Sequence, residues 1–477
     1  MKRSSGVLMH ISSLWGDYKI GSFGAEAKEF VDFLVQCGFS YWQVLPFCLP
    51  DECNSPYKSF GAFSGNYYFI DLPTLYTKGY ITKEELDSER QTDKYLCEFS
   101  SLKTSRLELL KKASLKFSDF EKMQAFYDDN PQILNFCEFM ALKKANNYLP
   151  FTLWKVFTPD SFELSAWKFI EYEFYTQFLE LKNYANLKGV KIIGDMPIYV
   201  DFDSSDVYFN KEEFLLDKNL KPKLVAGVPP DYFSKDGQLW GNPLYDYKKM
   251  QESNFLWWRQ RLAFYKKFYD GVRIDHFRAF CDYYAIAPTE KTAKNGKWIK
   301  GPRLKLINEF KKMQGDFLII AEDLGVITDE VRALVDKSGF PGMRVLQFGF
   351  LGDKNSPHLP HNYINNSIAY TGTHDNNTLL GYVWEQPDNI KKQITTYFGV
   401  REEDWNNSYD QIFRQMLASP AGLCIFQIQD LLKYGSDTRM NTPGKADGNW
   451  AFRITKDSLF SIDKTALKNY NEIYNRN

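Results

Sequence analysis

The chain has little net charge, few histidines and no long apolar run. Its 477 residues include 59 basic and 60 acidic side chains, and the formal net charge of -1 provides no electrostatic attraction to nucleic acid or to an anionic membrane. No apolar stretch reaches the roughly 18 residues of a membrane-spanning helix, and residues 1–5 lack the features of a signal peptide. These absences predict a cytoplasmic protein with no nucleic-acid partner and no membrane partner.

Cysteine and histidine occur in patterns that argue against metal and redox chemistry. The seven cysteines include no CxxC pair, so buried, reduced thiols are expected instead of a zinc ribbon or a dithiol. Only five histidines are present, and His358 and His361 have no third ligand near them in the sequence. The segment from Asp201 to Asp206 starts like a calcium loop but lacks the glycine at its sixth position. We therefore expect no metal site.

Aromatic side chains are the main excess in the composition. Phe, Tyr and Trp make up 17% of the chain, and most of them are expected in the core. Tyr232, Phe233 and Trp240 instead fall in a loop rich in Gly and Pro, where burial alone does not explain them. Sugar rings stack their apolar C–H faces on aromatic planes. These loop aromatics therefore point weakly toward a carbohydrate ligand.

Short apolar runs bounded by turn residues predict eight buried parallel strands. The predicted strands are residues 6–11, 41–45, 190–193, 271–274, 317–321, 343–348, 367–370 and 422–427. Helix-period segments separate them, such as residues 25–37, followed by the stop signal Gly38, and residues 328–337. About eight alternations of strand and helix are typical of a (β/α)8 TIM barrel. A doubly wound open sheet is the alternative, but no Gly-x-Gly-x-x-Gly follows the first strand.

Two intervals between predicted strands are longer than ordinary connections. Residues 82–161 contain several stretches rich in Lys, Glu and Leu, and they are predicted to form a helical insertion subdomain between the second and third strands. Residues 201–247 are rich in Pro, Gly, Asp and aromatics and are predicted to form a loop insertion on the active face. We therefore predict a single catalytic (β/α)8 barrel of the α/β class over residues 1–477, with helical and loop insertions on its C-terminal face.

Three acidic residues each follow a predicted strand. Asp275 follows the run GVRI, Glu322 follows LIIA, and Asp375 lies just beyond the strand in YTGTHD. Active sites of TIM barrels lie at the C-terminal ends of the strands. Two aspartates and a glutamate there are what a retaining glycosidase mechanism needs: a nucleophile, an acid/base, and a group that stabilises the distorted sugar.

Asp275 and Glu322 have local settings that suit different protonation states. Arg273 lies two residues before Asp275 and projects from the same face of the strand, so its guanidinium can keep that carboxylate ionised. Glu322 follows four apolar residues, and desolvation would raise its pKa and favour the protonated acid. A salt bridge at a strand end is the alternative for Asp275. A helix N-cap cluster with Asp323 is the alternative for Glu322.

Asp375 and Asp195 are less distinctive in their local sequence. His374 precedes Asp375 and could belong to a hydrolase triad, but no Gly-x-Ser-x-Gly nucleophile elbow is present. An Asx-turn among the neighbouring amides is a competing interpretation of Asp375. Asp195 ends the third predicted strand, where it could bind sugar hydroxyls or form a structural salt bridge.

The chain resembles the amylomaltases, also called disproportionating enzymes, which are the 4-α-glucanotransferases of glycoside hydrolase family 77 in the α-amylase clan. The resemblance covers nearly the whole chain and is weakest in residues 82–161. It rests on the three carboxylate segments and on these motifs: RSSGVL from Arg3, WQVLP from Trp42, SPY from Ser55, GDMPIYV from Gly194, VAGVPPDYFS from Val225, WGNPLY from Trp240, LPHN from Leu359, RMNTP from Arg439 and NW from Asn449. So many separate matches in one order are highly specific.

The resemblance implies a role for each of the three acidic residues. Asp275 would be the nucleophile, Glu322 the acid/base and Asp375 the transition-state stabiliser. It also implies a set of substrate-binding residues: Ser55, Tyr57, Asp195, Tyr232, Phe233, Gln238, Trp240, Asn242, Arg273 and His374. The expected partners are maltooligosaccharides and α-1,4-glucans, with no metal and no organic cofactor. We expect a monomer or a weak homo-oligomer.

The activity that the resemblance implies is transfer of glucan segments to the 4-hydroxyl of another glucan. An aromatic loop that shields the intermediate from water would favour a sugar acceptor over water. The same residues could serve a hydrolase, so an α-amylase-type hydrolase is the close alternative. A glucan-binding protein without catalytic activity is the alternative from another class.

Overall fold

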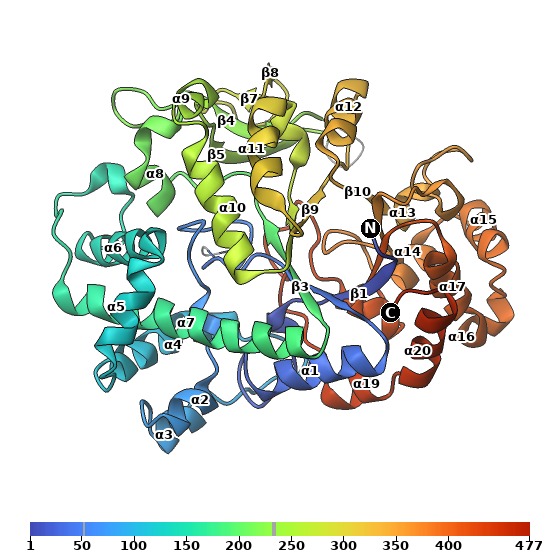
Figure 1. Ribbon diagram of the computed structural model, residues 1–477, viewed down its shortest axis with the longest axis horizontal. Helices are drawn as coiled ribbons and strands as arrows, with labels where there is room; N and C mark the ends of the chain where they lie inside the picture. Colours follow the sequence, from blue (N-terminus) through green and yellow to red (C-terminus); the bar gives the residue numbers. More distant parts are fainter. Residues whose placement is uncertain (51–52, 231–234) are drawn as a thin grey trace.

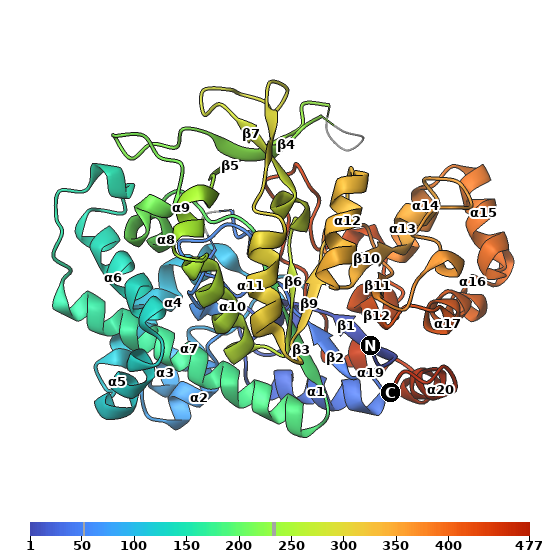
Figure 2. The same cartoon turned by 45° about the horizontal axis from the view of Figure 1, so that its top comes forward.

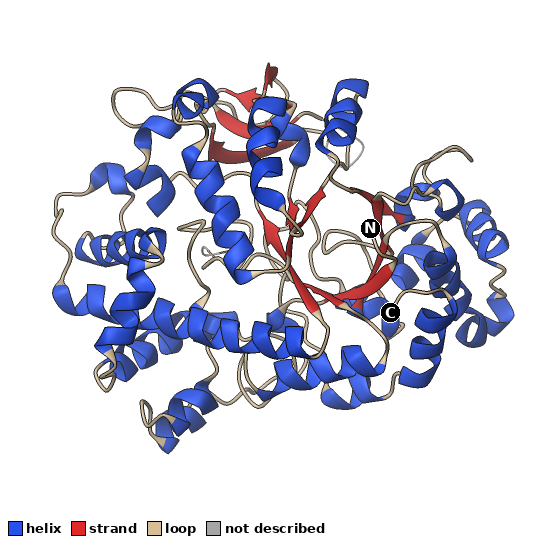
Figure 3. Cartoon of the chain, in the orientation of Figure 1, coloured by secondary structure: helices blue, strands red, loops and turns tan. Residues whose placement is uncertain are grey.

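The computed structural model describes residues 1–50, 53–230 and 235–477. Eight parallel strands close into a barrel in the order β1-β12-β11-β10-β9-β6-β3-β2, and helices surround this ring (Figure 1, Figure 3). The barrel strands are β1 (Ser4–Leu8), β2 (Tyr41–Gln43), β3 (Lys191–Met196), β6 (Gly271–Ile274), β9 (Leu318–Ala321), β10 (Gly342–Val345), β11 (Ser367–Tyr370) and β12 (Leu423–Gln427). Closure of the sheet confirms the predicted (β/α)8 barrel and excludes the doubly wound open sheet.

Every predicted strand coincides with a barrel strand, with shifts at the ends. Strands β1, β6, β11 and β12 are buried along their whole length, as expected for strands covered on both faces. The first prediction ran too far, because Ile11 begins a 3₁₀ turn (Ile11–Ser13). The prediction for residues 343–348 also ran too far, into the short helix α13 (Leu346–Gly349). Both turns are buried, and hydrophobicity alone does not distinguish a buried turn of helix from a strand.

The helices that follow the barrel strands begin and end at the expected signals. The C-terminal stop of α1 is Gly38, whose φ of 77° is left-handed, and Thr328 caps α12 by accepting a hydrogen bond from the Val331 N–H. Helices outside the β2–β3 connection are α1 (Ala25–Gln36), α8 (Ser205–Phe209), α9 (Tyr247–Glu252), α10 (Leu256–Phe268), α11 (Leu304–Gln314), α12 (Asp329–Ser338), α13, α14 (Leu379–Glu385), α15 (Asp388–Phe398), α16 (Trp405–Ser408), α17 (Asp410–Ala418), α18 (Ile428–Leu431), α19 (Lys456–Phe460) and α20 (Lys464–Ile473).

The connection between β2 and β3 is largely helical. Its helices are α2 (Leu72–Thr77), α3 (Lys83–Asp87), α4 (Phe99–Ser114), α5 (Phe120–Asp128), α6 (Pro131–Ala145) and α7 (Ser161–Leu187). Helices α4, α5 and α6 pack against the long helix α7, and the group lies to the left of the barrel in Figure 1. Helix α7 also packs against α1, so it joins this group to the barrel.

Buried polar side chains of α7 hold the chain segment that follows β2. The Glu171 carboxylate accepts a hydrogen bond from the Gly65 N–H (2.8 Å), and the Gln177 side chain accepts one from the Asp71 N–H (2.7 Å). Burial raises the pKa of Glu171 well above its usual value, and the bond from Gly65 offsets part of this shift. The helical connection therefore supports the segment just after Tyr57.

A second, antiparallel sheet has the strand order β5-β4-β7-β8. It contains β4 (Val225–Val228), β5 (Gln238–Pro243), β7 (Asp282–Ile286) and β8 (Lys297–Lys300). Figure 2 shows β4, β5 and β7 above the barrel strands. Two of these strands lie in residues 201–247, which the sequence analysis treated as loop. They are short and interrupted by Gly and Pro, so they carry no alternating pattern that would reveal them.

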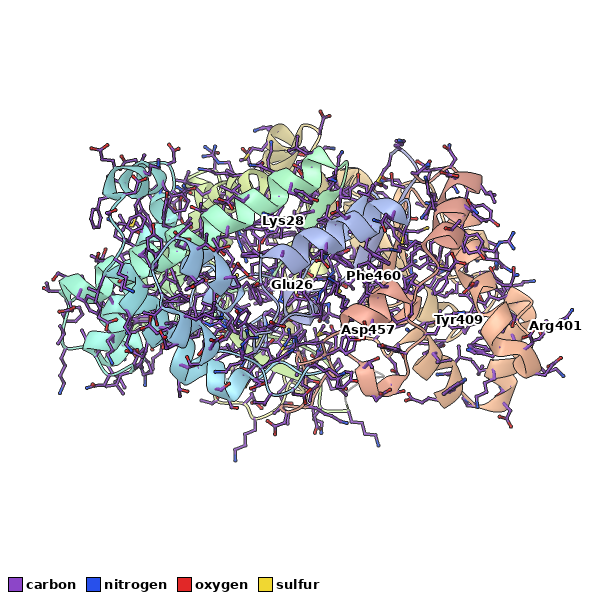
Figure 4. The ribbon with its side chains drawn as sticks, turned by 90° about the horizontal axis from the view of Figure 1, so that it is seen from below. Glu26, Lys28, Arg401, Tyr409, Asp457 and Phe460 are labelled. Carbon is purple, nitrogen blue, oxygen red and sulfur yellow. The ribbon has the colours of Figure 1, made fainter. Side chains whose placement is uncertain are left out.

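The C-terminal segment packs back against the first helix. In the view from below, α1, labelled at Glu26, lies beside α19, labelled at Asp457 (Figure 4). The Lys456 ammonium is 2.8 Å from the Glu29 carboxylate and links α19 to α1. An exposed pair of this kind adds little stability, because solvent screens it, so burial of Leu459 of α19 contributes more to holding the segment in place.

Two further expectations concern cysteines and membranes. Six of the seven cysteines are buried thiols outside any disulfide, namely Cys37, Cys48, Cys97, Cys137, Cys281 and Cys424, whereas Cys53 is exposed. Their state agrees with the expectation of reduced cysteines. Within residues 1–50, 53–230 and 235–477, no helix combines the length and the apolar character needed to cross a bilayer.

Replacing Gly65 with Ala tests the contact between α7 and the chain segment after β2. A Cβ atom at this position would overlap the Phe174 ring of α7, so we expect Gly65→Ala to lower the free energy of unfolding by about 1–3 kcal/mol. The measurement is the urea dependence of unfolding. As a control, Gly352→Ala would place its Cβ 3.7 Å from the nearest atom, in Ser356, and should change stability by less than about 0.5 kcal/mol. Equal stabilities of the two variants would contradict the close packing.

Candidate active site

Four of the predicted site residues lie at the C-terminal ends of three adjacent barrel strands. Asp195 on β3 is paired in register with Arg273 on β6. Ile274 of β6 is paired with Ala321 of β9, so Asp275 and Glu322 directly follow residues that are neighbours in the sheet. Neighbouring strands lie about 4.8 Å apart, and the Glu322 N–H bonds to the Ile274 carbonyl at 3.1 Å. Residues far apart in the sequence thus form one cluster.

Arg273 is the central cation of this cluster. Its Nη1 lies 2.9 Å from both carboxylate oxygens of Asp195 and 2.9 Å from Oδ1 of Asp275. Burial opposes the charged guanidinium, but the charges of Asp195 and Asp275 outweigh it and raise the pKa of Arg273. The side chains of Arg273 and Asp195 are almost fully buried, whereas 29% of the Asp275 side chain is exposed. Asp275 is therefore the member of this group that a ligand can reach.

Glu322 sits in a setting that keeps its carboxyl group neutral at pH 7. The side chain is buried, and burial, assisted by the charge of Asp275, raises its pKa to about 8. Arg273 and two backbone N–H groups oppose this shift. These groups are His276, which donates to Oε2 at 2.6 Å, and Leu324, which donates to Oε1 at 2.9 Å. Desolvation exceeds these opposing effects, so the group has the protonation state of a general acid.

Asp375 has the opposite electrostatic setting. Asn441 donates to its Oδ1 at 2.6 Å, and Nε2 of His374 lies 3.3 Å from its Oδ2. Desolvation by itself would raise the pKa of Asp375. The charge and hydrogen bond of His374, together with the bond from Asn441, outweigh desolvation and lower this pKa to about 2. About 47% of the Asp375 side chain is exposed. It is therefore an ionised carboxylate that faces the open side of the site.

Tyr57 connects the two sides of the cluster. Its hydroxyl donates to Asp195 Oδ2 at 2.8 Å and lies 3.3 Å from Nδ1 of His374. The rings of Tyr57 and His374 are stacked, with centroids 4.8 Å apart and an interplanar angle of 22°. Trp450 lies beside both rings, at centroid distances of 6.0 and 5.8 Å. Tyr57, Asp195 and His374 therefore form one rigid unit.

The remaining predicted binding residues lie around this cluster in different ways. Ser55 Oγ accepts a hydrogen bond from the Tyr57 N–H (3.3 Å), and the Asn242 amide donates to the Val200 carbonyl (3.0 Å). The polar atoms of Ser55 and Asn242 are thus engaged by the protein, and their contact with substrate stays a prediction. Tyr232 and Phe233 lie outside the described residues.

Gln238 and Trp240 approach the cluster from β5 of the second sheet. The Trp240 indole donates to the Gln238 side-chain oxygen at 3.1 Å. The edge of Trp240 also meets the His276 ring, with centroids 5.0 Å apart and an interplanar angle of 89°. The His276 N–H bonds to the Glu322 carboxyl group, so His276 lies between Trp240 and Glu322.

Three residues of the site received no role in the sequence analysis. They are Arg439 and Asn441, which bond to the Asp375 carbonyl and carboxylate, and Trp450, which packs on Tyr57. The motifs RMNTP and NW contain these residues, but their spacing does not predict a contact with a residue more than 60 positions earlier. The one feature that could have indicated a role is the presence of a polar Arg and Asn in a loop before Pro443.

In the part of the chain that the structure describes, no group of three or more His, Cys, Asp or Glu side chains is arranged to hold a metal ion. The site does hold three carboxyl groups in different electrostatic settings: Glu322, whose pKa is raised, Asp275, which is paired with arginine, and Asp375, whose pKa is lowered.

Carboxyl groups of opposite protonation at the C-terminal mouth of a closed barrel place the chain among the (β/α)8 barrel proteins with acid–base sites. Residues 9–458 match the model of glycoside hydrolase family 77, described as 4-alpha-glucanotransferase, and the chain belongs to this family.

Relatives and a solved structure agree with this assignment. A 4-alpha-glucanotransferase of Clostridium butyricum is 43% identical over 472 residues, which cover 95% of this chain and 96% of the relative. One from Thermus thermophilus is 38% identical and covers 96% of both chains. The amylomaltase of Streptococcus agalactiae, solved in complex with acarbose, has a TM-score of 0.95 at 38% identity, with 100% of both chains covered.

The opposite pKa shifts of Glu322 and Asp375 predict opposite effects of amide substitution on stability. Between about pH 4.5 and pH 8, native Glu322 keeps a proton that the unfolded chain has lost, so native stability falls as pH rises through this window. We expect Glu322→Gln to raise Tm by a few degrees at pH 8, with the gain shrinking toward pH 5.

Asp375→Asn should lower Tm at pH 7, because the folded-state pKa is depressed and the ionised carboxylate stabilises the native state above about pH 4. This loss should shrink as pH falls toward 2. Differential scanning fluorimetry over pH 3–8 measures both variants. A Tm difference for Glu322→Gln that does not change with pH would contradict the neutral carboxyl group.

Proposed function

We propose that this protein is a 4-α-glucanotransferase that moves α-1,4-glucan segments from a donor maltooligosaccharide to the 4-hydroxyl of an acceptor glucan or glucose. The observation that carries the proposal is the buried carboxyl group of Glu322, whose pKa is raised by desolvation, on the strand next to the arginine-paired carboxylate of Asp275. An acid next to a carboxylate nucleophile is what retaining cleavage of a glycosidic bond requires. Family membership and the names of full-length relatives support the same reaction.

In the first step, Asp275 attacks the anomeric carbon of the donor. Glu322 gives its proton to the glycosidic oxygen, the C1–O bond breaks, and the fragment on the reducing-end side leaves with a free 4-hydroxyl. A covalent glycosyl ester on Asp275 remains. The adjacent strand positions of Asp275 and Glu322 are compatible with the roughly 5–5.5 Å carboxyl separation of retaining enzymes. The Arg273 contact fixes the orientation of the attacking carboxylate.

In the second step, Glu322 acts as the base. It takes the proton from the 4-hydroxyl of the acceptor, the acceptor oxygen attacks C1, and the ester bond to Asp275 breaks. Two inversions at C1 restore the α linkage, and Glu322 is again protonated. The Asp375 carboxylate, ionised at neutral pH and exposed to the site, would stabilise the positive charge that develops on the sugar ring in both steps.

The sugar in the cleavage subsite would be held by a group of residues that surround Asp275. We assign this role to Tyr57, Asp195, Arg273 and His374, since their hydrogen bonds and stacking join them into one unit. Ser55, Tyr232, Phe233, Gln238, Trp240 and Asn242 would serve the glucan chain on either side. Trp240 packs on His276, next to Glu322, where it could shield the intermediate from water.

The proposed function also implies which partners, location and domain organisation to expect. We propose maltooligosaccharides and α-1,4-glucans as the only partners required, with no cofactor, no nucleic acid and no membrane contact. The buried thiols fit a location in the cytoplasm, and we propose a monomer or a weak homo-oligomer. We also propose that the chain acts as a single catalytic unit, in which residues 82–161 are a helical insertion and residues 201–247 a loop insertion on the active face.

The direct test is incubation with maltotriose, followed by chromatography of the products. Transfer yields glucose together with chains longer than maltotriose, whereas hydrolysis yields only shorter products and a binding protein leaves the substrate unchanged. Asp275→Asn should lower turnover by roughly 10⁴-fold or more, the scale of loss expected when a nucleophile is removed.

Asp282→Asn serves as the matched control for Asp275→Asn. Asp282 also pairs with an arginine, Arg278, at 3.0 Å, but it lies outside the cluster of carboxyl groups. We expect the Asp282→Asn variant to keep a transfer activity within about threefold of the wild type. Activity of Asp275→Asn near the wild-type level would refute the assignment of the nucleophile.

The role of Glu322 as acid predicts a dependence on pH and on the leaving group. Turnover of maltotriose should fall as pH rises through about 8, because the neutral form of Glu322 is lost. Glu322→Gln should be nearly inactive on maltotriose. With α-maltotriosyl fluoride, whose leaving group needs little protonation, the variant should still form the glycosyl-enzyme, seen by mass spectrometry as a mass increase. No adduct with the fluoride, together with a full loss on maltotriose, would contradict an acid role.

A further inference from the structure

The loop that carries His374 and Asp375, residues 371–378, is rigid within itself. The side-chain oxygen of Asn376 accepts from both the N–H and the hydroxyl of Thr373, each at 2.9 Å. The Asp375 N–H in turn donates to the Thr373 hydroxyl at 3.3 Å. A segment tied internally in this way moves as one body. The position of the Asp375 carboxylate therefore depends on what holds the two ends of the loop, in addition to the direct bonds from Arg439 and Asn441.

Both ends of the loop meet one buried carboxyl group. Asp430 lies on α18, directly after barrel strand β12. Its Oδ1 accepts a hydrogen bond from the N–H of Leu379, the residue just after the loop, at 2.7 Å. The hydroxyl of Thr371, the first residue of the loop, faces the same carboxyl group and lowers its pKa. That contact is looser, because among the described residues Oδ2 has no partner in good hydrogen-bond geometry.

Asp430 occupies an unfavourable place for a carboxyl group. It is fully buried, and burial raises its pKa to about 7 despite the bonds from Thr371 and Leu379. An apolar residue at such a position would avoid the desolvation of a polar group. A buried aspartate that contacts both ends of a loop at the active site is thus better explained by what it holds in place than by stability.

We propose that Asp430 is a positioning residue of the reaction, which sets the place of the Asp375 carboxylate by tying Leu379, at the end of the 371–378 loop, to helix α18 just after barrel strand β12, and by facing Thr371 at the start of the loop. The inference rests on the proposed function. Asp430 acts through the loop and touches no substrate.

Other contacts hold the loop without Asp430, so its removal should tilt the loop and leave the fold intact. The Gln347 amide donates to the Asn377 carbonyl at 2.7 Å, and the Asn377 amide donates to the Ser436 hydroxyl at 2.9 Å. Asn441 still bonds to Asp375. The expected change is a shift of the Asp375 carboxylate by about 1 Å or less. Such a shift weakens stabilisation of the transition state more than binding of the ground state.

The test compares Asp430→Ala and Asp430→Asn with the wild type, using maltotriose as substrate. Asp430→Ala should lower kcat by about 10–100-fold, since a displacement of about 1 Å can cost on the order of 10²-fold, and KM should stay within about threefold. Asp430→Asn keeps an acceptor for the Leu379 N–H and should recover most of the lost kcat. A kcat for Asp430→Ala within twofold of the wild type would overturn the proposal.

Asp71→Ala provides the matched control. Asp71 is also a buried aspartate that accepts a hydrogen bond near the start of a helix, from the Thr74 N–H at 2.9 Å, but it caps α2 and makes no contact with the 371–378 loop. We expect Asp71→Ala to lower the thermal stability of the protein, as Asp430→Ala does, but to keep the wild-type kcat. Equal kcat losses in both variants would mean a general structural effect and would also overturn the proposal.

Failure of this inference can be told apart from failure of the proposed function. If wild-type protein produces no longer chains from maltotriose, the proposed function fails before any Asp430 variant is measured. If the wild type transfers and Asp275→Asn does not, the proposed function stands and the Asp430 variants test the loop alone.

Discussion

The arrangement of the site depends on one guanidinium group that is shared by two carboxylates. Arg273 lies 2.9 Å from Asp195 and 2.9 Å from Asp275, in a position with almost no exposure to solvent. Two carboxylates at neighbouring strand ends would repel each other without it. Through Asp195, the same ion pair reaches Tyr57 and the stacked ring of His374. Side chains from four different parts of the barrel are thereby held around one charge.

The site also shows how a barrel separates the protonation states of similar groups. Glu322 and Asp375 are both carboxyl groups at strand ends, yet the pKa of one is raised to about 8 and that of the other is lowered to about 2. Glu322 is buried and its hydrogen bonds come from neutral backbone groups. Asp375 is more exposed and is paired with His374 and Asn441. Desolvation decides the first case, and charge with hydrogen bonding decides the second.

The barrel was predictable from the sequence because most of its strands lie in short apolar runs, although site residues such as Arg273 on β6 interrupt them. The strands β4, β5, β7 and β8 were not predictable, since they are short, interrupted by Gly or Pro in β4 and β5, and joined into one sheet only by the pairing of β4 with the distant β7. Within the site, the Arg273–Asp275 contact follows from spacing along one strand. The bond from Asn441 to Asp375 crosses 66 positions, and local pattern carries no information about it. The roles of Tyr57 and His374 came only from family resemblance.

The hydrogen bonds to Glu322 come from main-chain amides, and this limits how the acidity of the group can be altered by evolution or by design. The N–H groups of His276 and Leu324 are present whatever side chains those positions carry, and only proline would delete one of them. His276 also adopts a left-handed conformation (φ 48°), which depends on the backbone path around it. Changes that shift the working pH range of such a protein must therefore act on the packing that excludes water from the carboxyl group, or on the charges of its neighbours.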